Sequence, residues 1–112
     1  MNRQEIFDKV KSHLLTQNEQ ANSGEGGYCY ENYKGLKCAI GCLLPKEHPG
    51  LEYDHGIIKL LEVYPDLGEF FDISDNLDVI FMHDLQIVHD SYEPELWPEL
   101  LNKVARAWGL NG

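Results

Sequence analysis

The sequence predicts a single α+β domain spanning residues 1–112, in which about four helices pack with one β-hairpin. Three observations predict this fold. Apolar residues recur at helical spacing in several segments, residues 28–44 are rich in Tyr, Cys and Ile around Asn32 and Gly35, and 112 residues suit one small domain. A hydrophobic content of 43% is sufficient for a core.

The first helix is predicted to begin after Asn2 and to end near Asn18. Asn2 can cap exposed backbone N–H groups, and Glu5 lies at the positive end of the helix dipole, where a carboxylate is favourable. One face of this helix is predicted to enter the core. Its apolar residues recur at helical spacing: Ile6, Phe7, Val10 and Leu14.

The predicted hairpin covers residues 28–44. Leu36, Cys38 and Ile40 alternate along the chain, which places them on one face of a strand. Gly41 then interrupts the run and Pro45 ends it. Short apolar runs fit either kind of element, so a helical turn over residues 38–44 remains an alternative to the second strand.

After a loop that ends at Gly56, a short helix is predicted up to Pro65, which cannot continue it. Another turn follows, and its large apolar side chains are expected in the core: Leu67, Phe70 and Phe71.

Two longer helices complete the predicted fold. Ser74 or Asp75 is expected to cap the first of them, which ends near Ser91. Its apolar stripe is Leu77, Phe81, Leu85 and Val88. The last helix has Pro98 in its first turn and Gly109 as its stop. Its stripe is Trp97, Leu100, Leu101, Val104 and Trp108.

The charge of the chain argues against binding to nucleic acid or to an anionic membrane, because the formal net charge is -10. Residues 60–102 contain eleven acids and no Lys or Arg. A basic protein partner is therefore predicted. The acids expected to face outward and to bind it are Asp78, Asp84, Glu95 and Glu99. Tyr92 and Trp97 could add aromatic anchors, although Trp97 fits the core better.

The cysteines are odd in number, which favours reduced thiols over a disulfide framework. Packed, inert thiols are the favoured interpretation, and no metal or cofactor is expected. The alternative is a zinc site, for which the chain offers these ligands: Cys29, Cys38, Cys42, His48 and His55. Only Cys38 and Cys42 approach the close spacing of structural zinc ligands.

A second alternative is thiol catalysis, with Cys38 as nucleophile and His89 as base. Asp84 or Asp90 would orient the imidazole. Because neighbouring side chains on a helix point about 100° apart, Asp90 is the poorer candidate.

Several strings of the sequence together resemble a family of small uncharacterised proteins from bacteriophages, prophages and bacterial genomes. The family pattern is Cys-x-Tyr, then Gly-x-x-Cys-Ala-x-Gly, then Leu-Gln-x-x-His-Asp, then a Trp in the final helix. It falls here on Cys29, Tyr30, Gly35, Cys38, Ala39, Gly41, Leu85, Gln86, His89, Asp90 and Trp97. Glu31 and Asn32 depart from the Arg-Gly that follows the tyrosine in that family. The resemblance implies an accessory protein of phage origin that acts on a host factor.

If these strings mark one place, the hairpin lies across the helix that precedes Ser91, and Gln86 and His89 reach its backbone or the region of Cys38. A buried polar cluster there needs hydrogen bonds within the chain. A ligand pocket formed by the motif residues is an alternative to this structural role.

The sequence therefore favours a non-enzymatic, acidic, cytoplasmic protein that binds a basic surface of a host protein. One partner that fits this hypothesis is a nucleic-acid-binding host protein whose DNA site the chain would occlude. The alternative is a cysteine-dependent enzyme or a zinc-supported module centred on Cys38 and His89.

Overall fold

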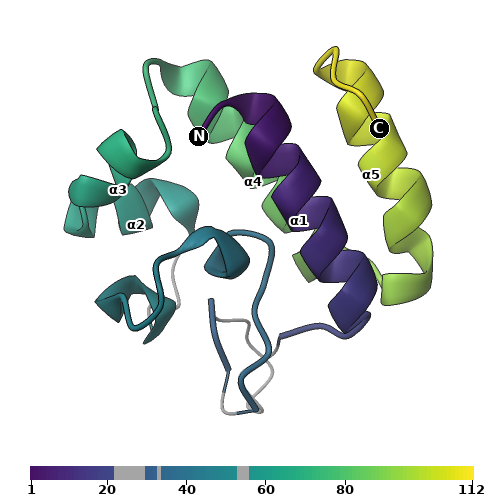
Figure 1. Cartoon of the computed structure of the whole chain (residues 1–112), viewed down its shortest axis with the longest axis horizontal. Coiled ribbons are helices and arrows are strands. Elements are labelled where there is room, and N and C mark those ends of the chain that lie inside the picture. Colours follow the sequence, from purple (N-terminus) through teal and green to yellow (C-terminus); the bar gives the residue numbers. More distant parts are fainter. Residues whose placement is uncertain (22–29, 33, 53–55) are drawn as a thin grey trace.

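The computed structural model describes residues 1–21, 30–32, 34–52 and 56–112 (Figure 1). Helices α1 (Arg3–Gln17), α4 (Asn76–Ser91) and α5 (Trp97–Ala107) pack against one another. Helices α2 (Ile57–Val63) and α3 (Asp66–Phe70) lie on the side of α4 that is remote from α5. Three 3₁₀ helices complete the described chain: Gly41–Leu43, Pro49–Glu52 and Pro94–Leu96.

The predicted α+β class is wrong, because the described residues form helices and contain no strand or sheet. In place of the hairpin, Glu31 and Lys37 form one isolated antiparallel bridge. The side-chain oxygen of Asn32 accepts the backbone N–H groups of Lys34 and Leu36, at 3.0 and 2.9 Å. This side chain closes a local loop and takes up donors that a strand ladder would use.

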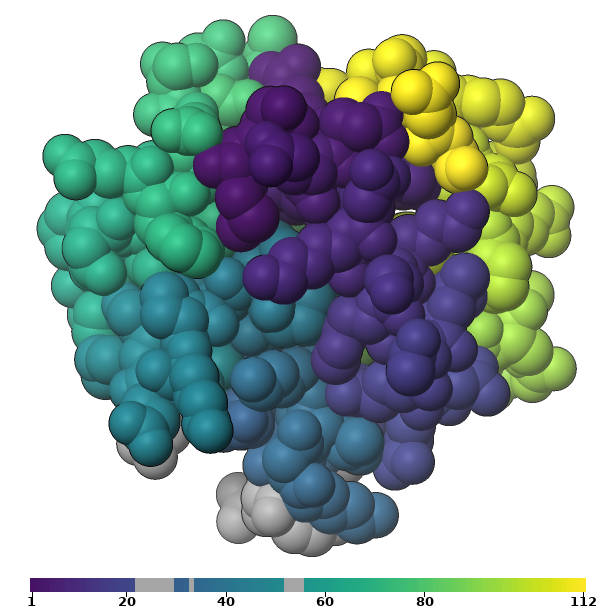
Figure 2. All heavy atoms as spheres, in the orientation of Figure 1, coloured from purple at the N-terminus to yellow at the C-terminus, as the bar shows by residue number. Residues whose placement is uncertain are grey.

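The helical alternative for residues 38–44 is the one that forms. The N–H of Cys42 donates to the carbonyl of Cys38 at 3.2 Å, and the 3₁₀ helix Gly41–Leu43 follows. Cys38, Ala39 and Ile40 are all buried, so the alternation of a strand is absent. This turn packs against α1, and Figure 2 shows the two segments, in blue and purple, side by side on one face.

Helix α1 forms as predicted. The side chain of Asn2 accepts the N–H of Glu5 at 2.8 Å, and the carboxylate of Glu5 accepts the N–H of Asn2 at 3.1 Å. This reciprocal pair is a capping box. The helix ends where Asn18 adopts a left-handed conformation with φ 50°. The predicted apolar stripe is buried: Ile6, Phe7, Val10 and Leu14.

Helix α4 begins at the predicted cap and ends at the predicted residue. Asp75, rather than Ser74, accepts the N–H groups of Leu77 and Asp78. Phe81, Leu85 and Val88 enter the core, whereas Leu77 is 53% exposed. The buried stripe of α4 therefore starts one turn later than predicted.

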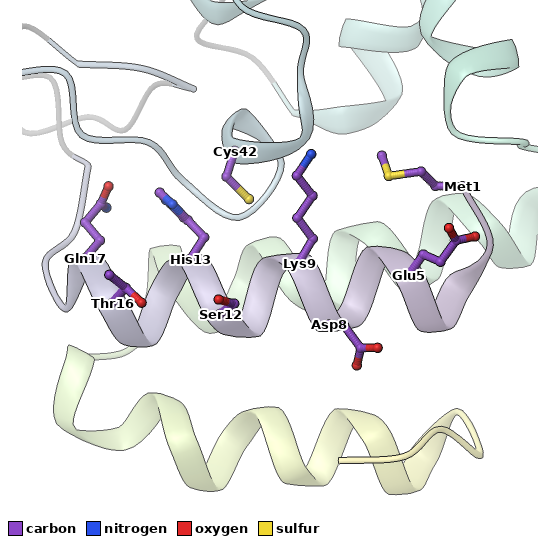
Figure 3. Close-up of a pocket in the computed structure, with 9 residues that line it drawn as sticks. All are labelled: Met1, Glu5, Asp8, Lys9, Ser12, His13, Thr16, Gln17 and Cys42. Carbon is purple, nitrogen blue, oxygen red and sulfur yellow. The ribbon is translucent and has the colours of Figure 1, made fainter.

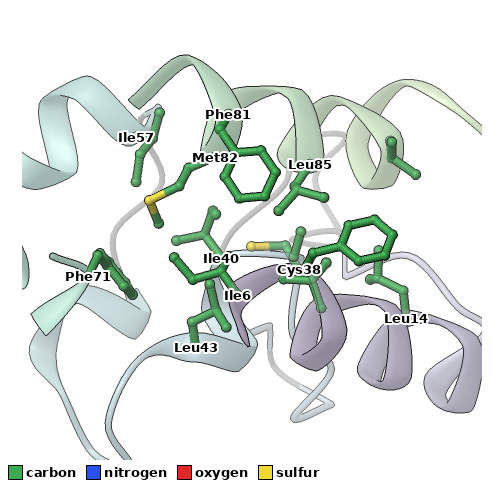
Figure 4. Packing of buried hydrophobic residues seen from close by; sticks show 14 of the residues in the cluster. Ile6, Leu14, Cys38, Ile40, Leu43, Ile57, Phe71, Phe81, Met82 and Leu85 are labelled. Atoms are coloured by element: carbon green, nitrogen blue, oxygen red, sulfur yellow. The ribbon is translucent and has the colours of Figure 1, made fainter. Parts of the chain in front are cut away.

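The core lies between α1, α4, α5 and the turn at residues 38–44. Figure 4 shows part of it, with Ile6 of α1 and Phe81 of α4 packed around Cys38 and Ile40. Trp97 and Leu101 of α5 are buried, as predicted, and Gly109 follows α5 with φ 67°. Of the apolar residues predicted in the α3 turn, Leu67 and Phe71 are buried, but Phe70 is 39% exposed.

Gly41 is the position at which the backbone tolerates no side chain. A Cβ atom there would lie 1.9 Å from the carbonyl oxygen of Tyr30. We predict that Gly41→Ala lowers the free energy of unfolding by about 3 kcal/mol, because the clash is with backbone and the core must shift. Urea unfolding followed by circular dichroism measures the change.

Gly68 provides the matched control for this prediction. It lies within α3, and a Cβ atom there meets nothing within 4 Å. Gly68→Ala should be neutral or stabilising, by about 0.5 kcal/mol, because alanine favours the helix. Equal stability of the two variants would contradict the close approach at Gly41.

Candidate functional site

His89 is the one polar side chain that is fully buried among the described residues. Its Nε2 accepts the backbone N–H of Ala21 at 2.8 Å, and its Nδ1 lies 2.6 Å from a carboxylate oxygen of Asp90. Because Nε2 accepts a hydrogen bond, the neutral ring carries its proton on Nδ1 and donates it to Asp90. His89 therefore joins α4 to the chain that follows α1.

Gln86 extends this cluster to the turn at residues 38–44. Its side-chain oxygen accepts the N–H of Ile40 at 3.1 Å, and its amide nitrogen lies 3.4 Å from both carboxylate oxygens of Asp90. The structure thus brings Gln86 to the segment that the motif reading assigned to it. His89 reaches Ala21 instead of that segment.

Asp90 orients His89, contrary to the expectation that adjacent helix positions are poorly placed for this. The expectation considered only the directions in which the two Cβ atoms leave the helix. Rotation about the side-chain bonds brings the carboxylate of Asp90 to the ring. Backbone spacing alone does not predict this contact, because it does not fix side-chain torsions.

Of the two described thiols, Cys38 is fully buried and Cys42 is half-buried, and both are hydrogen-bonded to the backbone. Burial raises the pKa of Cys38 to about 12, and its sulfur accepts the N–H of Gly41 at 3.3 Å. Burial likewise raises the pKa of Cys42 to about 12, and its thiol donates to the carbonyl of Ala39 at 3.1 Å. Both thiols are therefore neutral near pH 7, the form that is a poor nucleophile and a poor metal ligand.

The residues suggested for catalysis do not form a triad in the structure. Both ring nitrogens of His89 are engaged, with Ala21 and Asp90. Asp84, on α4, accepts the indole N–H of Trp108 at 2.9 Å. Its carboxylate therefore contacts the end of α5 and does not orient His89.

The residues suggested for zinc are only partly described. Cys29 and His55 lie outside the described residues, so their positions are not compared. His48 lies 2.9 Å from Asp66 through Nε2 and accepts the N–H of Gly50 through Nδ1. Over the described ranges, no group of three or more His, Cys, Asp or Glu side chains is arranged to hold a metal ion.

Two of the four predicted surface acids bind other parts of the chain. Asp78 accepts the N–H and the hydroxyl of Ser74 and lies 2.9 Å from Nε of Arg3. The N–H of Ser74, followed by the Arg3 guanidinium, holds the pKa of Asp78 below its usual value. Asp78 thus ties α4 to α1, and Asp84 ties α4 to α5 through Trp108.

Glu95 and Glu99, the other two predicted acids, are exposed. Glu93, which was not among the predicted surface acids, is exposed and close to them in sequence. Within the described chain none of the three carboxylates has a hydrogen-bond or ion-pair partner. Glu93 also lies in the stretch without Lys or Arg, and this position was the signal that could have added it to the predicted surface acids.

Two large side chains are also exposed in the α4–α5 connector (residues 92–96), which contains Glu93 and Glu95 and precedes Glu99 in α5. Tyr92 is 41% exposed and Leu96 is 45% exposed. Trp97, the second suggested anchor, is fully buried and serves the core. The connector and the first turn of α5 therefore present an aromatic ring, a leucine and three carboxylates to solvent.

Hydrogen bonds and a ring contact around His89 hold the α4–α5 connector against the core. The carbonyl of Tyr92 accepts the indole N–H of Trp97 at 3.1 Å and the side-chain amide of Gln20 at 2.9 Å. Gln20 also donates to the carbonyl of His89, and the Trp97 ring stacks on the His89 ring with centroids 5.6 Å apart. A connector held at both ends presents its side chains with little ordering entropy to lose on binding.

A shallow groove of about 810 Å³ runs along the outer face of α1 (Figure 3). Lys9 and His13 point into it beside Cys42, and Glu5 and Asp8 complete its charges. His13 lies 2.9 Å from the carbonyl of Lys37, and burial lowers its pKa. The groove combines charges of both signs, in contrast to the acids at the α4–α5 connector.

Comparison of this chain with protein-family models, with curated proteins and with solved structures finds no match. None of the helices in the described part of the chain has both the length and the apolar character needed to cross a bilayer.

The thiols provide a test of the packed-cysteine interpretation. In a Cys29→Ser, Cys42→Ser background, we predict that Cys38, which is fully buried, reacts with a chromogenic disulfide reagent at pH 8 only as fast as the protein unfolds. A thiol with a pKa of about 12 is ionised in only about one molecule in ten thousand at that pH. Rapid labelling of Cys38 in the folded protein would show an accessible thiolate.

The His89 contacts predict the effect of removing the ring nitrogens. His89→Phe keeps an aromatic ring against Trp97 but leaves the Ala21 N–H without a partner, so the free energy of unfolding should fall by about 2–3 kcal/mol. His83→Phe, on the exposed side of the same helix, should change it by less than about 0.5 kcal/mol. Chemical unfolding of both variants makes the comparison, and similar small effects would contradict the role of His89.

Proposed function

We propose that this chain is a non-enzymatic, acidic interaction protein that binds a basic surface of another protein through the α4–α5 connector and the start of α5. The observation that carries the proposal is the set of exposed, unpaired glutamates around Tyr92 and Leu96. Those acids are Glu93, Glu95 and Glu99.

The charge distribution supports a basic partner. Residues 60–102 supply eleven acids and no Lys or Arg, so the glutamates of the connector have no cation nearby in sequence. Like charges destabilise a free surface, and a partner with Lys and Arg relieves this repulsion. Complementary charge also raises the rate of encounter.

The side chains of Tyr92 and Leu96 supply contact area that can be buried, which carboxylates alone do not. Tyr92 and Leu96 can bury area at the centre of an interface, and Tyr is enriched among residues that contribute most to binding. Charged residues at the rim then set orientation and salt dependence. Asp78 and Asp84 are not needed for this surface, because they hold α4 to α1 and α5.

The resemblance to phage and prophage proteins supports a bacterial setting. An acidic accessory protein in the cytoplasm of a bacterium meets basic surfaces chiefly on nucleic-acid-binding proteins, whose DNA sites are rich in Lys and Arg. Occupying such a site would exclude DNA from it.

The proposal is tested by capture of bacterial proteins that heparin retains, using the immobilised chain. We expect specific retention that weakens as salt increases and is lost in the Glu93→Gln, Glu95→Gln, Glu99→Gln variant. The matched control is the Glu47→Gln, Glu62→Gln, Glu69→Gln variant, which changes the net charge equally with exposed residues outside the connector and α5.

The control variant should retain the same proteins as the unmodified chain. Equal loss in both variants would mean that net charge alone causes retention. Retention that neither salt nor the connector variant reduces would contradict the proposal.

A further inference from the structure

The groove on the outer face of α1 is lined on one side by a polar stripe of that helix. Four side chains at helical spacing form the stripe: Lys9, Ser12, His13 and Thr16. The half-buried Cys42, from the turn at residues 38–44, lies across from them (Figure 3). The volume of about 810 Å³ falls within the range of sites for small ligands, roughly 300–1,000 Å³. An ammonium group and two hydroxyls therefore line one hollow of suitable size.

The two segments that meet at this groove carry only positive ionic side chains. Residues 9–18 and 32–46 together contain five Lys and no Asp or Glu, in a chain of net charge -10. Hydrogen bonds join the two segments, because His13 and Gln17 both bind the backbone of Lys37. The fold therefore places a cationic region within an acidic protein.

The side chains that titrate in the groove are under the influence of these cations. Burial raises the pKa of Cys42, and the charges of Lys9 and Lys37 oppose that rise. Burial lowers the pKa of His13, and the charge of Lys37 lowers it further. Lys9 and Lys37 thus act on the groove from α1 and from the facing segment, and they make the potential between them positive.

The two carboxylates that border the groove are already engaged. Glu5 accepts the N–H of Asn2 in the capping box, and Asp8 accepts the side-chain amide of Gln4 at 2.8 Å. Asp8 also extends from α1 away from Lys9 (Figure 3). Lys9 has no hydrogen-bond or ion-pair partner in the described part of the chain. Its ammonium group is therefore available to a ligand.

We propose that this groove binds the anionic group of a small ligand, either a phosphate or a carboxylate. Lys9 pairs with the anion, the hydroxyls of Ser12 and Thr16 donate hydrogen bonds to it, and Lys37 adds attraction from the facing segment. Ammonium and hydroxyl groups are donors that suit phosphate and carboxylate oxygens.

The charge of the whole chain favours a small anion over an acidic macromolecule. At physiological salt, screening limits the interaction of exposed charges to about 8 Å. A small anion in the groove therefore responds mainly to the cations beside it. A large acidic partner would also meet the rest of a surface whose net charge is -10.

This site is separate from the surface proposed for a protein partner. The groove belongs to α1 and the turn at residues 38–44, whereas the other surface belongs to the α4–α5 connector and α5. One site needs positive charge and the other needs negative charge. Different residues therefore test them, and either proposal can fail without the other.

The test is a titration of the isotope-labelled full chain with inorganic phosphate and, separately, with citrate, followed by amide chemical shifts. The pH is held at 7, and sodium chloride keeps the ionic strength constant. We expect saturable shifts at the amides of Lys9, His13 and Thr16, with a dissociation constant on the order of 1 mM. A response to phosphate alone or to citrate alone would identify which anionic group the groove binds.

Two variants assign the binding to the groove. Lys9→Gln should weaken it by about fivefold or more, because the charged partner of the anion is lost. Ser12→Ala, Thr16→Ala should weaken it by about threefold through the loss of hydrogen bonds, and alanine preserves the helix. The matched control is Lys103→Gln, which removes one exposed cation from α5 and should bind within about twofold of the unmodified chain.

Three results would overturn the proposal. The first is the absence of saturable shifts at the groove with either anion. The second is equal weakening in Lys9→Gln and Lys103→Gln, which would mean that net charge alone attracts the anion. The third is the same set of shifts with sodium chloride alone, which would show a general salt effect.

Discussion

The burial of one histidine is the constraint on which the rest of the arrangement depends. An imidazole removed from water must find partners for both nitrogens, or the fold loses about 1–3 kcal/mol for each unmet group. His89 meets this requirement with Ala21 on one side and Asp90 on the other. Its ring also lies against Trp97. These contacts hold together the segment after α1, the end of α4 and the start of α5. The α4–α5 connector is therefore held in one conformation.

The acidic half of the chain divides its carboxylates between two tasks. Asp78, Asp84 and Asp90 accept hydrogen bonds from Arg3, Trp108 and the His89 cluster, and so hold the helices together. The carboxylates of Glu93, Glu95 and Glu99 accept none within the described chain and remain in solvent. Charge that the fold uses internally therefore differs from charge available to a partner. The composition gives the total number of acids but does not tell which carboxylates are used within the fold and which are available to a partner.

Local signals predicted the helices well, because caps and apolar spacing act over one or two turns. The Asn2 capping box and the ends of α4 are examples. The hairpin failed because Tyr, Cys and Ile suit a buried turn as well as a strand, and the loop closed by Asn32 favoured the turn. In the site, the motif indicated Gln86 and His89 together. Which backbone groups they would meet depended on tertiary packing, and so did the internal use of Asp78.

The claim that His89 fastens the segment after α1 onto α4 is tested most directly by amide hydrogen exchange at Ala21 in the unmodified chain. The account predicts that this amide exchanges as slowly as amides in the middle of α4, because its N–H is bonded to a buried ring nitrogen. Exchange at the rate of an unprotected peptide would contradict it, since the hydrogen bond from Ala21 to His89 would then not hold in solution.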